Sequence, residues 1–339
     1  MVTGSKFAGQ TVDAGSRTTV LPNSYMDTVV RSEDWHAKRS ESVQQRAWMA
    51  WFIEMGHLIY QAADRITYLY PHAIEEALGL GSVLEKSFVI PNGMHVEDFD
   101  QTHRRFCQLS AQRDAQRQPW RLAFAGRLVP IKGLLVLLEA SATLRNGGLP
   151  FTLDIMGNAD DQEYAMQCQR KCSELRLDDV VSFVGNQDLR QSFAEYDLLV
   201  LPSYNEGLPI VVLEAMAVGL PVVGTRVGGM AQIIEEPLTE RGNDRCGILV
   251  EPGNPRALAR ALHEVLSDSR MYHRLQSQAR SRVLSHFQLE QAMSAYRKVY
   301  RQLAEKAIMP SAWSTPNRPM TRFPRLQHDG LFLQPLDNF

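Results

Sequence analysis

Cysteine is scarce in this sequence, and long uncharged apolar runs are missing. Four cysteines occur in 339 residues, and no Asn-x-Ser/Thr glycosylation site is present. Four cysteines are too few for a disulfide framework in a chain of this length. No uncharged stretch reaches the roughly 18–20 residues that span a bilayer, and residues 1–24 lack the apolar segment of a secretory signal. These absences fit a reducing compartment, and we expect a cytoplasmic protein.

The sequence also lacks an excess of charge and a pattern of metal ligands. Lysine and arginine total 36 against 38 acidic residues, a net charge of −2, so no nucleic-acid partner is expected. Cys168 and Cys172 are four residues apart, but no Cys-x-x-Cys or paired histidines accompany them. Core or surface thiols are therefore favoured over a metal or redox site. The apolar share of 44% is ordinary for a folded protein, and the length predicts roughly two domains.

The front of the chain predicts a leader followed by a small α/β unit. Residues 1–24 hold few apolar side chains and predict a disordered leader. Within residues 25–100 the pattern is helix, strand, helix, strand, and the first helix, 48–64, has apolar residues at helical spacing. Residues 101–118 are polar and rich in arginine, which predicts a linker carrying a solvent-exposed helix.

Residues 119–270 predict one complete, doubly wound α/β domain with a parallel sheet. Apolar runs typical of strands buried on both faces alternate here with helical patterns. The expected strands are 122–125, 152–156, 180–183, 198–201, 221–224 and 248–250. The expected helices between them are 133–145, 163–175, 189–196, 210–218 and 230–235. We expect further helices at 271–308 and a flexible, proline-containing tail at 309–339.

Two cations follow the first strand of this domain. Arg127 comes directly after the strand, and Lys132 lies five residues later at the start of a helix. Neither a Gly-x-Gly-x-x-Gly fingerprint nor a Walker loop is present, which argues against a nicotinamide enzyme and a P-loop NTPase. Ligands of open α/β sheets bind at the carboxyl ends of strands, where cations and helix N–H groups suit a diphosphate. The alternative is that both side chains are solvated surface charges.

Two carboxylates and several glycines follow later strands. Glu206 and Gly207 lie in the loop after 198–201, and Glu214 lies inside the apolar helix that follows. A carboxylate in such a helix needs hydrogen-bond donors or solvent, and ligand hydroxyls are suitable donors. Paired glycines, Gly228 and Gly229, follow the next strand and permit close backbone approach. The alternative is a solvent-facing Glu214 and a helix-capping Glu206.

Together these motifs resemble the donor-binding half of the retaining GT-B glycosyltransferases of family 4. The resemblance covers residues 64–268 and is specific, because the motifs occur in the family's order. They are Val89-Ile90-Pro91-Asn92-Gly93, the Gly126-Arg127-x-x-x-x-Lys132-Gly133 stretch, the Glu206-x7-Glu214 pair, Pro221-Val222-Val223-Gly224-Thr225 and Val227-Gly228-Gly229. The fold implied is GT-B: one complete Rossmann-like C-terminal domain and a remnant of an N-terminal Rossmann-like domain.

The resemblance implies a catalytic set of Arg127, Lys132 and Glu206. Arg127 and Lys132 would hold the diphosphate of a nucleotide sugar and stabilise the leaving group without a metal or other cofactor. Glu206 would contact the donor sugar, and Glu214 the ribose hydroxyls. The base is placed, by position only, near 156–157 and 184–189. The full donor-binding set implied is Gly126, Arg127, Lys132, Glu206, Gly207, Leu208 and Glu214.

A narrower resemblance is to the glycosyltransferases of Pel exopolysaccharide synthesis. It rests on residues 48–64, on the Val129-Pro130-Ile131-Lys132 stretch and on the insertion at 237–246. It implies UDP-glucose as donor and a polysaccharide acceptor. It also implies a cytoplasmic enzyme, peripheral to the inner face of the membrane, that serves a membrane synthase complex.

Two departures from the family pattern matter. Met94-His95 stands where the family usually has Val-Asp, and only residues 25–90 can belong to the N-terminal domain, so we expect that domain to be truncated. His36, His57 and His72 are present, but their contexts support no catalytic role. The leading hypothesis is thus a retaining hexosyltransferase. The alternatives are a nucleotide-sugar-binding module without turnover and a GT-B nucleotide-sugar epimerase, although the Glu-x7-Glu pattern favours transfer.

Overall fold

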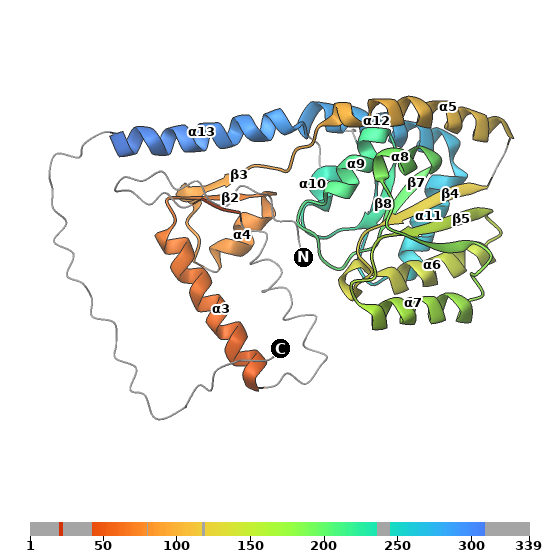
Figure 1. Cartoon of the computed structure of the whole chain (residues 1–339), viewed down its shortest axis with the longest axis horizontal. Coiled ribbons are helices and arrows are strands. Elements are labelled where there is room, and N and C mark those ends of the chain that lie inside the picture. The colour runs from red at the N-terminus through yellow and green to blue at the C-terminus, as the bar shows by residue number, and fades with distance from the viewer. Residues whose placement is uncertain (1–19, 23–42, 80, 117–118, 236–244, 309–339) are drawn as a thin grey trace.

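The fold of the chain is seen in a computed structural model, which describes residues 20–22, 43–79, 81–116, 119–235 and 245–308. A smaller unit with a three-stranded sheet precedes a larger unit with a six-stranded sheet. Figure 1 shows the units side by side, with helix α13 (Leu289–Ile308) reaching from the larger unit across to the smaller one. Among the described helices, none combines the length and the apolar character that a bilayer span requires.

The smaller unit has the helix and strand order that the sequence predicts, with one strand more. Its core is formed by buried side chains that include Tyr60, Ile66 and Tyr68. Its three strands are parallel and lie in the order β1–β2–β3. Its elements are β1 (Val20–Pro22), α3 (Val43–Ala62), β2 (Arg65–Tyr68), α4 (His72–Leu78), the one-turn helix η1 (Leu84–Lys86) and β3 (Ser87–Val89).

The expectation of a disordered leader over residues 1–24 is wrong for Val20–Pro22. These residues form strand β1, which pairs with β2 in parallel register, Val20 opposite Arg65. A strand of three residues is too short to produce an alternating pattern, and its partner lies more than 40 residues away, so the sequence alone gave no signal for it. The rest of the expected leader, His36 and the tail 309–339 lie outside the described residues.

The larger unit is the doubly wound α/β domain that the sequence predicts. Every neighbouring strand pair is parallel, and the order is β6–β5–β4–β7–β8–β9. The chain therefore winds outward from β4 in one direction and then restarts at β7 in the other. This arrangement makes a topological switch point between the ends of β4 and β7, where open α/β sheets bind ligands.

All six predicted strands of this domain are present, as are the helices between them. The strands are β4 (Trp120–Ala125), β5 (Phe151–Met156), β6 (Val181–Gly185), β7 (Leu198–Leu201), β8 (Val222–Thr225) and β9 (Gly247–Val250). The connecting segments are η3 (Pro130–Lys132), α6 (Leu134–Asn146), α7 (Gln162–Glu174), α8 (Leu189–Ser192), η4 (Phe193–Glu195), α9 (Ile210–Val218) and α10 (Met230–Ile234). The helices α11 (Pro255–Ser267) and α12 (Ser269–His286) follow.

Helices cover both faces of the six-stranded sheet (Figure 1). Helices α6, α7 and α11 pack on one face, whereas α5 (Asp100–Gln116), α9 and α12 pack on the other. Strand β7 is buried along its whole length, as expected for a central parallel strand. Cys168 and Cys172 lie on the buried face of α7, and burial raises the pKa of the Cys168 thiol to about 11. Of the two predicted alternatives, core or surface thiols, these two cysteines are core thiols.

The expected linker at 101–118 is for the most part a helix that packs on the larger unit. A short turn, η2 (Val96–Phe99), leads into α5 (Asp100–Gln116). Phe99 and Phe106 are buried in the main core, and Thr102 and Ser110 are buried as well. The sequence does not predict that this helix packs on the sheet, because the segment is mostly polar. Phe99, Phe106 and Leu109 provide nearly all of its apolar surface.

Helix α13 connects the two units. The backbone of Met94 accepts a hydrogen bond from Leu289 and donates one to Phe287, so the turn after β3 is held at the junction of α12 and α13. Beyond it, Val299 and Leu303 of α13 form a small core with Ile90. His95 lies on the surface beside Glu97, with 3.0 Å between Nδ1 and Oε1.

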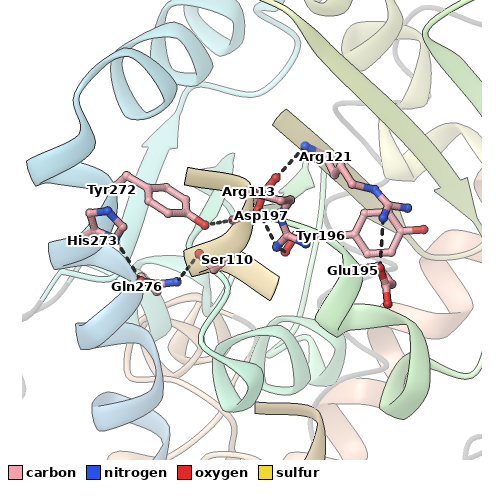
Figure 2. A network of polar contacts seen from close by, with 9 residues as sticks. All are labelled: Ser110, Arg113, Arg121, Glu195, Tyr196, Asp197, Tyr272, His273 and Gln276. Atoms are coloured by element: carbon pink, nitrogen blue, oxygen red, sulfur yellow. Dashed lines mark hydrogen bonds and ion pairs between the residues drawn. The ribbon is translucent and has the colours of Figure 1, made fainter. Parts of the chain in front are cut away.

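A polar network stabilises the amino ends of the central strands (Figure 2). Asp197, which directly precedes β7, is almost fully buried. Its carboxylate accepts hydrogen bonds from Nε of Arg113 and from the backbone N–H of Arg121, both at 2.8 Å. The Tyr272 hydroxyl donates to the Asp197 backbone carbonyl at 3.1 Å. This network ties α5 and α12 to the sheet at the end opposite the carboxyl ends of the strands.

Candidate nucleotide-sugar site

The candidate site lies at the carboxyl ends of β4 and β7, at the topological switch point. Arg127 follows β4 by two residues, and Lys132 ends η3, the turn after that strand. Glu206 lies in the loop between β7 and α9. The two parallel strands are neighbours in the sheet, so their loops meet even though they are far apart in the sequence.

The centre of the site is an ion pair between Lys132 and Glu206. Lys132 Nζ donates to Glu206 Oε1 at 2.7 Å, and the Ser203 hydroxyl donates to the same oxygen at 2.6 Å. The lysine side chain is 18% exposed and the glutamate side chain 7%. Such low exposure limits screening by solvent, so the pair is stronger than a surface pair. Sequence reasoning named both ionic residues but assigned no role to Ser203.

Arg127 lies beside this pair but is less constrained. Its guanidinium is half-exposed, and its nearest carboxylate partner is Asp160, with 3.5 Å between Nη1 and Oδ2. That distance is too long for a strong charge-assisted hydrogen bond. The preceding residue, Gly126, lies against the Lys132 side chain, with Lys132 Cε 4.0 Å from the position a Cβ would take. The structure therefore brings Gly126 to the Lys132 side chain, while the half-exposed Arg127 side chain lies near Asp160 in the loop after β5.

Two glycines allow the loops of the site to approach one another closely. Gly133 has a left-handed φ of +68°, and a Cβ there would lie 2.0 Å from the carbonyl oxygen of Pro202. Gly228 has φ +51°, and a Cβ there would lie 1.6 Å from the carbonyl oxygen of Glu206. Both contacts exclude any larger residue. The loops after β4 and β8 are thereby packed on the two sides of the Glu206 loop.

The start of α9 faces the same site. Pro209 precedes its first helical residue, and no side chain of the described residues caps this end, so backbone N–H groups of the first turn remain available to an anion. Leu208 is buried, and its carbonyl accepts a hydrogen bond from Asn92 Nδ2 at 2.9 Å. The Gly207 carbonyl accepts one from the Gly229 N–H at 2.7 Å. Asn92, which lies in the turn motif after β3, thus fixes this loop from the smaller unit.

Glu214 lies five residues into α9 and is half-buried. Within the part of the chain that the structure describes, its carboxylate makes no hydrogen bond and no ion pair. Burial raises the pKa of Glu214, and the positive charge of Arg190 opposes this shift. A desolvated carboxylate without donors costs free energy, which ligand hydroxyls would recover. Of the two alternatives left open by the sequence, the capping Glu206 is not found, because no side chain of the described residues caps the start of α9. Glu214 is partly exposed, as the second alternative requires.

The segments expected near the base also lie at this edge. The Gly126 N–H donates to the Met156 carbonyl at 2.9 Å, and the Gly157 N–H donates to the Gly185 carbonyl at 2.9 Å. The carboxyl ends of β4, β5 and β6 are therefore adjacent. The segments expected near the base, which follow β5 and β6, thus lie beside Gly126 of the expected diphosphate site. His57 lies in α3 and His72 in α4, both in the smaller unit.

Comparison with known proteins identifies the family. The family model described as "Glycosyl transferases group 1" matches residues 108–282, just over half of the chain. The chain therefore belongs to the glycosyl transferases group 1 family.

Among curated relatives, the amylovoran biosynthesis glycosyltransferase AmsK of Erwinia amylovora is 30% identical over 249 residues, which covers 71% of this chain and 54% of AmsK. The D-inositol 3-phosphate glycosyltransferase of Paenarthrobacter aurescens is 29% identical over 216 residues, covering 62% of this chain and 50% of that protein. The chain spans about half the length of these curated relatives.

Solved structures confirm the GT-B-type α/β fold. Sucrose-phosphate synthase from Thermosynechococcus elongatus superposes with a TM-score of 0.67 at 24% identity, covering 85% of this chain and 68% of that one. Anabaena Alr3699/HepE in complex with UDP-glucose superposes with a TM-score of 0.60 at 22% identity, covering 73% and 65%. At these identities the likeness concerns the fold alone.

Proposed function

We propose that the chain binds a nucleotide sugar, with UDP-glucose as the expected donor, and transfers its sugar with retention of configuration. The observation that carries this proposal is the Lys132–Glu206 pair, with Arg127 beside it, at the switch point of a doubly wound sheet. Membership of the glycosyl transferases group 1 family supports a transferase. The complex of HepE with UDP-glucose supports the choice of donor.

In this proposal the cations of the site act on the leaving group. Arg127 and Lys132 neutralise the diphosphate as the bond to the sugar breaks, and N–H groups at the start of α9 contribute further donors. Lys132 would then bridge the diphosphate and Glu206, because its ammonium has three donors and the Glu206 carboxylate uses only one of them. No metal or other cofactor has a part in this scheme.

The two glutamates orient the donor. Glu206 is held by Lys132 and Ser203, which fixes its carboxylate for contact with sugar hydroxyls. Glu214, which has no hydrogen-bond donor among the described residues, would accept hydrogen bonds from the ribose hydroxyls. Both contributions are positional: they hold the donor so that an acceptor attacks the face from which the diphosphate departs.

Calorimetric titration with UDP and UDP-glucose in EDTA tests the donor site. We expect saturable binding by the native chain and strongly weakened binding by Lys132→Ala. Absence of binding by the native chain would refute the proposal. Competition with UDP-galactose and UDP-N-acetylglucosamine would then define the sugar, and we expect UDP-glucose to be preferred.

A binding module without turnover is the second candidate. It shares the donor site of the first candidate, since Lys132, Glu206 and Arg127 would bind a nucleotide sugar in both cases. The two candidates differ in one measurement, the release of UDP from UDP-glucose in the presence of acceptor. Binding without UDP release would identify the module, whereas formation of a UDP-sugar isomer without UDP would identify an epimerase.

We further propose a role in polysaccharide synthesis at the cytoplasmic face of a membrane, in association with a synthase complex. The similarity to AmsK, named for amylovoran biosynthesis, supports the polysaccharide part of this proposal. Co-purification of the tagged chain with membranes, reversed by high salt, would support peripheral association. Recovery of the chain in the supernatant alone would argue against it.

A further inference from the structure

The smaller unit carries an apolar surface outside its core. Five large apolar side chains are exposed within residues 58–84: Leu58 and Ile59 on α3, Leu78 at the end of α4, and Val83 and Leu84 at η1. Leu58 and Leu84 are 58% and 59% exposed. We call these five residues the α3–η1 surface. Apolar side chains gathered in this way mark a place where another segment or molecule binds.

Contacts between α3 and the segment after α4 hold this surface together. Lys86 Nζ donates to the carbonyl oxygens of Gln61 and Ala63, at 3.0 and 2.8 Å, so η1 lies beside the carboxyl end of α3. A Cβ on Gly81 would lie 3.9 Å from the ring of His57, so the turn between α4 and η1 lies against the same part of the helix. The five apolar side chains therefore come from elements that are in contact with one another.

Helix α3 is apolar on its outer side as well as on its inner side. Tyr60 is buried in the core of the smaller unit, and Leu58 lies nearly opposite, because successive helix residues are about 100° apart. Over residues 43–62 the charged side chains are Arg46 and Glu54 alone. A surface helix normally has a polar outer side, whereas a helix that is apolar all round is buried. The outer side of α3 therefore has the composition of a covered face.

The charge around the α3–η1 surface is negative. Residues 51–89 contain five acidic and two basic side chains, a net charge of −3, and Glu54, Asp64 and Glu85 are exposed. An anionic membrane surface attracts cations, so its charge does not match this surface. A second copy bound through the same surface would bring carboxylates against carboxylates. The occupant that fits is apolar and basic.

Residues 313–326 of the chain have this chemistry, although they lie outside the described residues. The segment contains three arginines and no acidic residue. Its large apolar residues are Trp313, Met320, Phe323 and Leu326. It is thus complementary to the α3–η1 surface in both charge and apolar character.

The place of this segment in the chain brings it to the smaller unit. Helix α13 ends at Ile308, and Leu303 in its carboxyl half packs with Ile90, which follows β3. Figure 1 shows this end of α13 beside the smaller unit. Residues 309–326 span up to ~60 Å when extended, whereas a compact unit of this size is ~30 Å across. The segment is therefore long enough to reach any face of the smaller unit.

We propose that residues 313–326 bind the α3–η1 surface of the same chain. Their apolar side chains cover Leu58 and Leu84, and their arginines lie beside the exposed carboxylates around them. Pro316, Pro319 and Pro324 restrict the free segment and so lower the conformational entropy lost on binding. The contact would fasten α13 to the smaller unit and shield a small core. It does not depend on the proposed nucleotide-sugar site.

Photo-cross-linking of the full chain tests this inference, with Leu84→p-benzoylphenylalanine as the probe. An equal mixture of ¹⁵N-labelled and unlabelled chains distinguishes contacts within one chain from contacts between copies. We expect mass spectrometry to find cross-links from position 84 to residues 313–326 of the same chain. Met166→p-benzoylphenylalanine, at an exposed position on α7 of the larger unit, is the matched control and should give no cross-link to this segment.

Charge reversal in the segment tests the electrostatic part of the inference. Arg322→Glu/Arg325→Glu should lower the cross-link yield by at least about threefold, because attraction to the carboxylates becomes repulsion. Arg256→Glu/Arg260→Glu, at exposed positions on α11, should leave the yield unchanged. Cross-links that join labelled to unlabelled chains would overturn the inference in favour of contact between copies. Cross-links to other segments alone, no cross-links, or a native yield after reversal of Arg322 and Arg325 would overturn it as well.

Discussion

Replacing Lys132 by methionine probes the central interaction of the candidate site. Lys132 and Glu206 are joined at 2.7 Å, and the glutamate side chain is 7% exposed. Methionine keeps the length of the lysine stem but removes the charge. Glu206 would then retain one donor, the Ser203 hydroxyl, for a carboxylate that is nearly out of contact with water.

The expected loss of stability can be worked out from this geometry. Breaking one side of a buried ion pair costs about 3–5 kcal/mol, because the other charge stays buried and unpaired. Lys132 is partly exposed and Ser203 remains, so the lower end applies, about 3 kcal/mol. For a unit of this size, each kcal/mol lowers Tm by about 2–4 °C. We therefore expect Tm to fall by roughly 6–12 °C, measured by circular dichroism and by urea unfolding.

A double-mutant cycle separates the pair from other effects of the substitution. Glu206→Gln removes the buried charge, so the combined variant should regain most of the stability that Lys132→Met loses. Lys171→Met is the matched control: its ion pair with Glu139 spans 3.4 Å, and both side chains are about a third or more exposed. It should change stability by less than about 0.5 kcal/mol.

The same substitution should weaken UDP binding. A charge-assisted hydrogen bond contributes about 1.5–3 kcal/mol, so we expect the Kd for UDP to rise roughly tenfold to a hundredfold. The reasoning would be refuted if Lys132→Met matched the Lys171→Met control in both stability and UDP affinity. That result would mean that the pair is screened like a surface pair and does not face the ligand.

Three further predictions address other parts of the structure. Gly228→Ala should lower stability by more than about 2 kcal/mol and weaken UDP binding, because the alanine Cβ would collide with the Glu206 carbonyl. Native-like stability together with native-like UDP affinity would contradict this close approach of the two loops. Glu214→Gln should weaken UDP binding yet raise stability at pH 7. Burial raises the pKa of Glu214 in the folded state, so the ionisation of this group lowers the native chain's stability as pH rises above about 4.5. Urea unfolding between pH 4.5 and 8 should show this slope in the native chain and not in the variant. Asp197→Ala should cost about 3–5 kcal/mol by leaving Arg113 buried and unpaired, while any remaining folded protein binds UDP with native affinity; a changed Kd would mean that the two ends of the sheet are coupled.

The sequence predicts the larger unit well because its pattern is strong. Six apolar runs alternate with helical patterns, and each of the six strands forms where the pattern places it. The pairing of Lys132 with Glu206 was not predictable in the same way, because the residues are 74 positions apart. Their contact depends on β7 lying next to β4, and a list of strands in chain order does not specify their order in the sheet.

The sequence predicts less where contacts are few or come from distant elements. Helix α5 was expected in a linker because its packing depends on Phe106 and a few smaller residues. A cavity of about 510 Å³ combines residues of α4 with the β8–α10 loop, more than 150 positions later. Local periodicity does not predict such a contact. The roles of Asn92 and Ser203 were not predicted either, because each depends on a hydrogen bond to an acceptor, the Leu208 carbonyl and the Glu206 carboxylate, whose position the fold sets.

Two carboxylates at opposite ends of the same sheet show how the fold separates stability from binding. Asp197, at the amino ends of the strands, is almost fully buried, and its carboxylate is satisfied by Arg113 and the Arg121 backbone (Figure 2). Glu214, towards the carboxyl ends, is half-buried and has no donor among the described residues. Burial raises the pKa of both groups, yet only Asp197 has protein donors that offset the cost of desolvation. A buried polar group without a hydrogen-bond partner lowers the free energy of unfolding, and an apolar residue packed in its place would avoid this cost. The satisfied carboxylate of Asp197 therefore stabilises the amino ends of the strands, whereas the role proposed for Glu214 at the other end is to accept hydrogen bonds from a ligand.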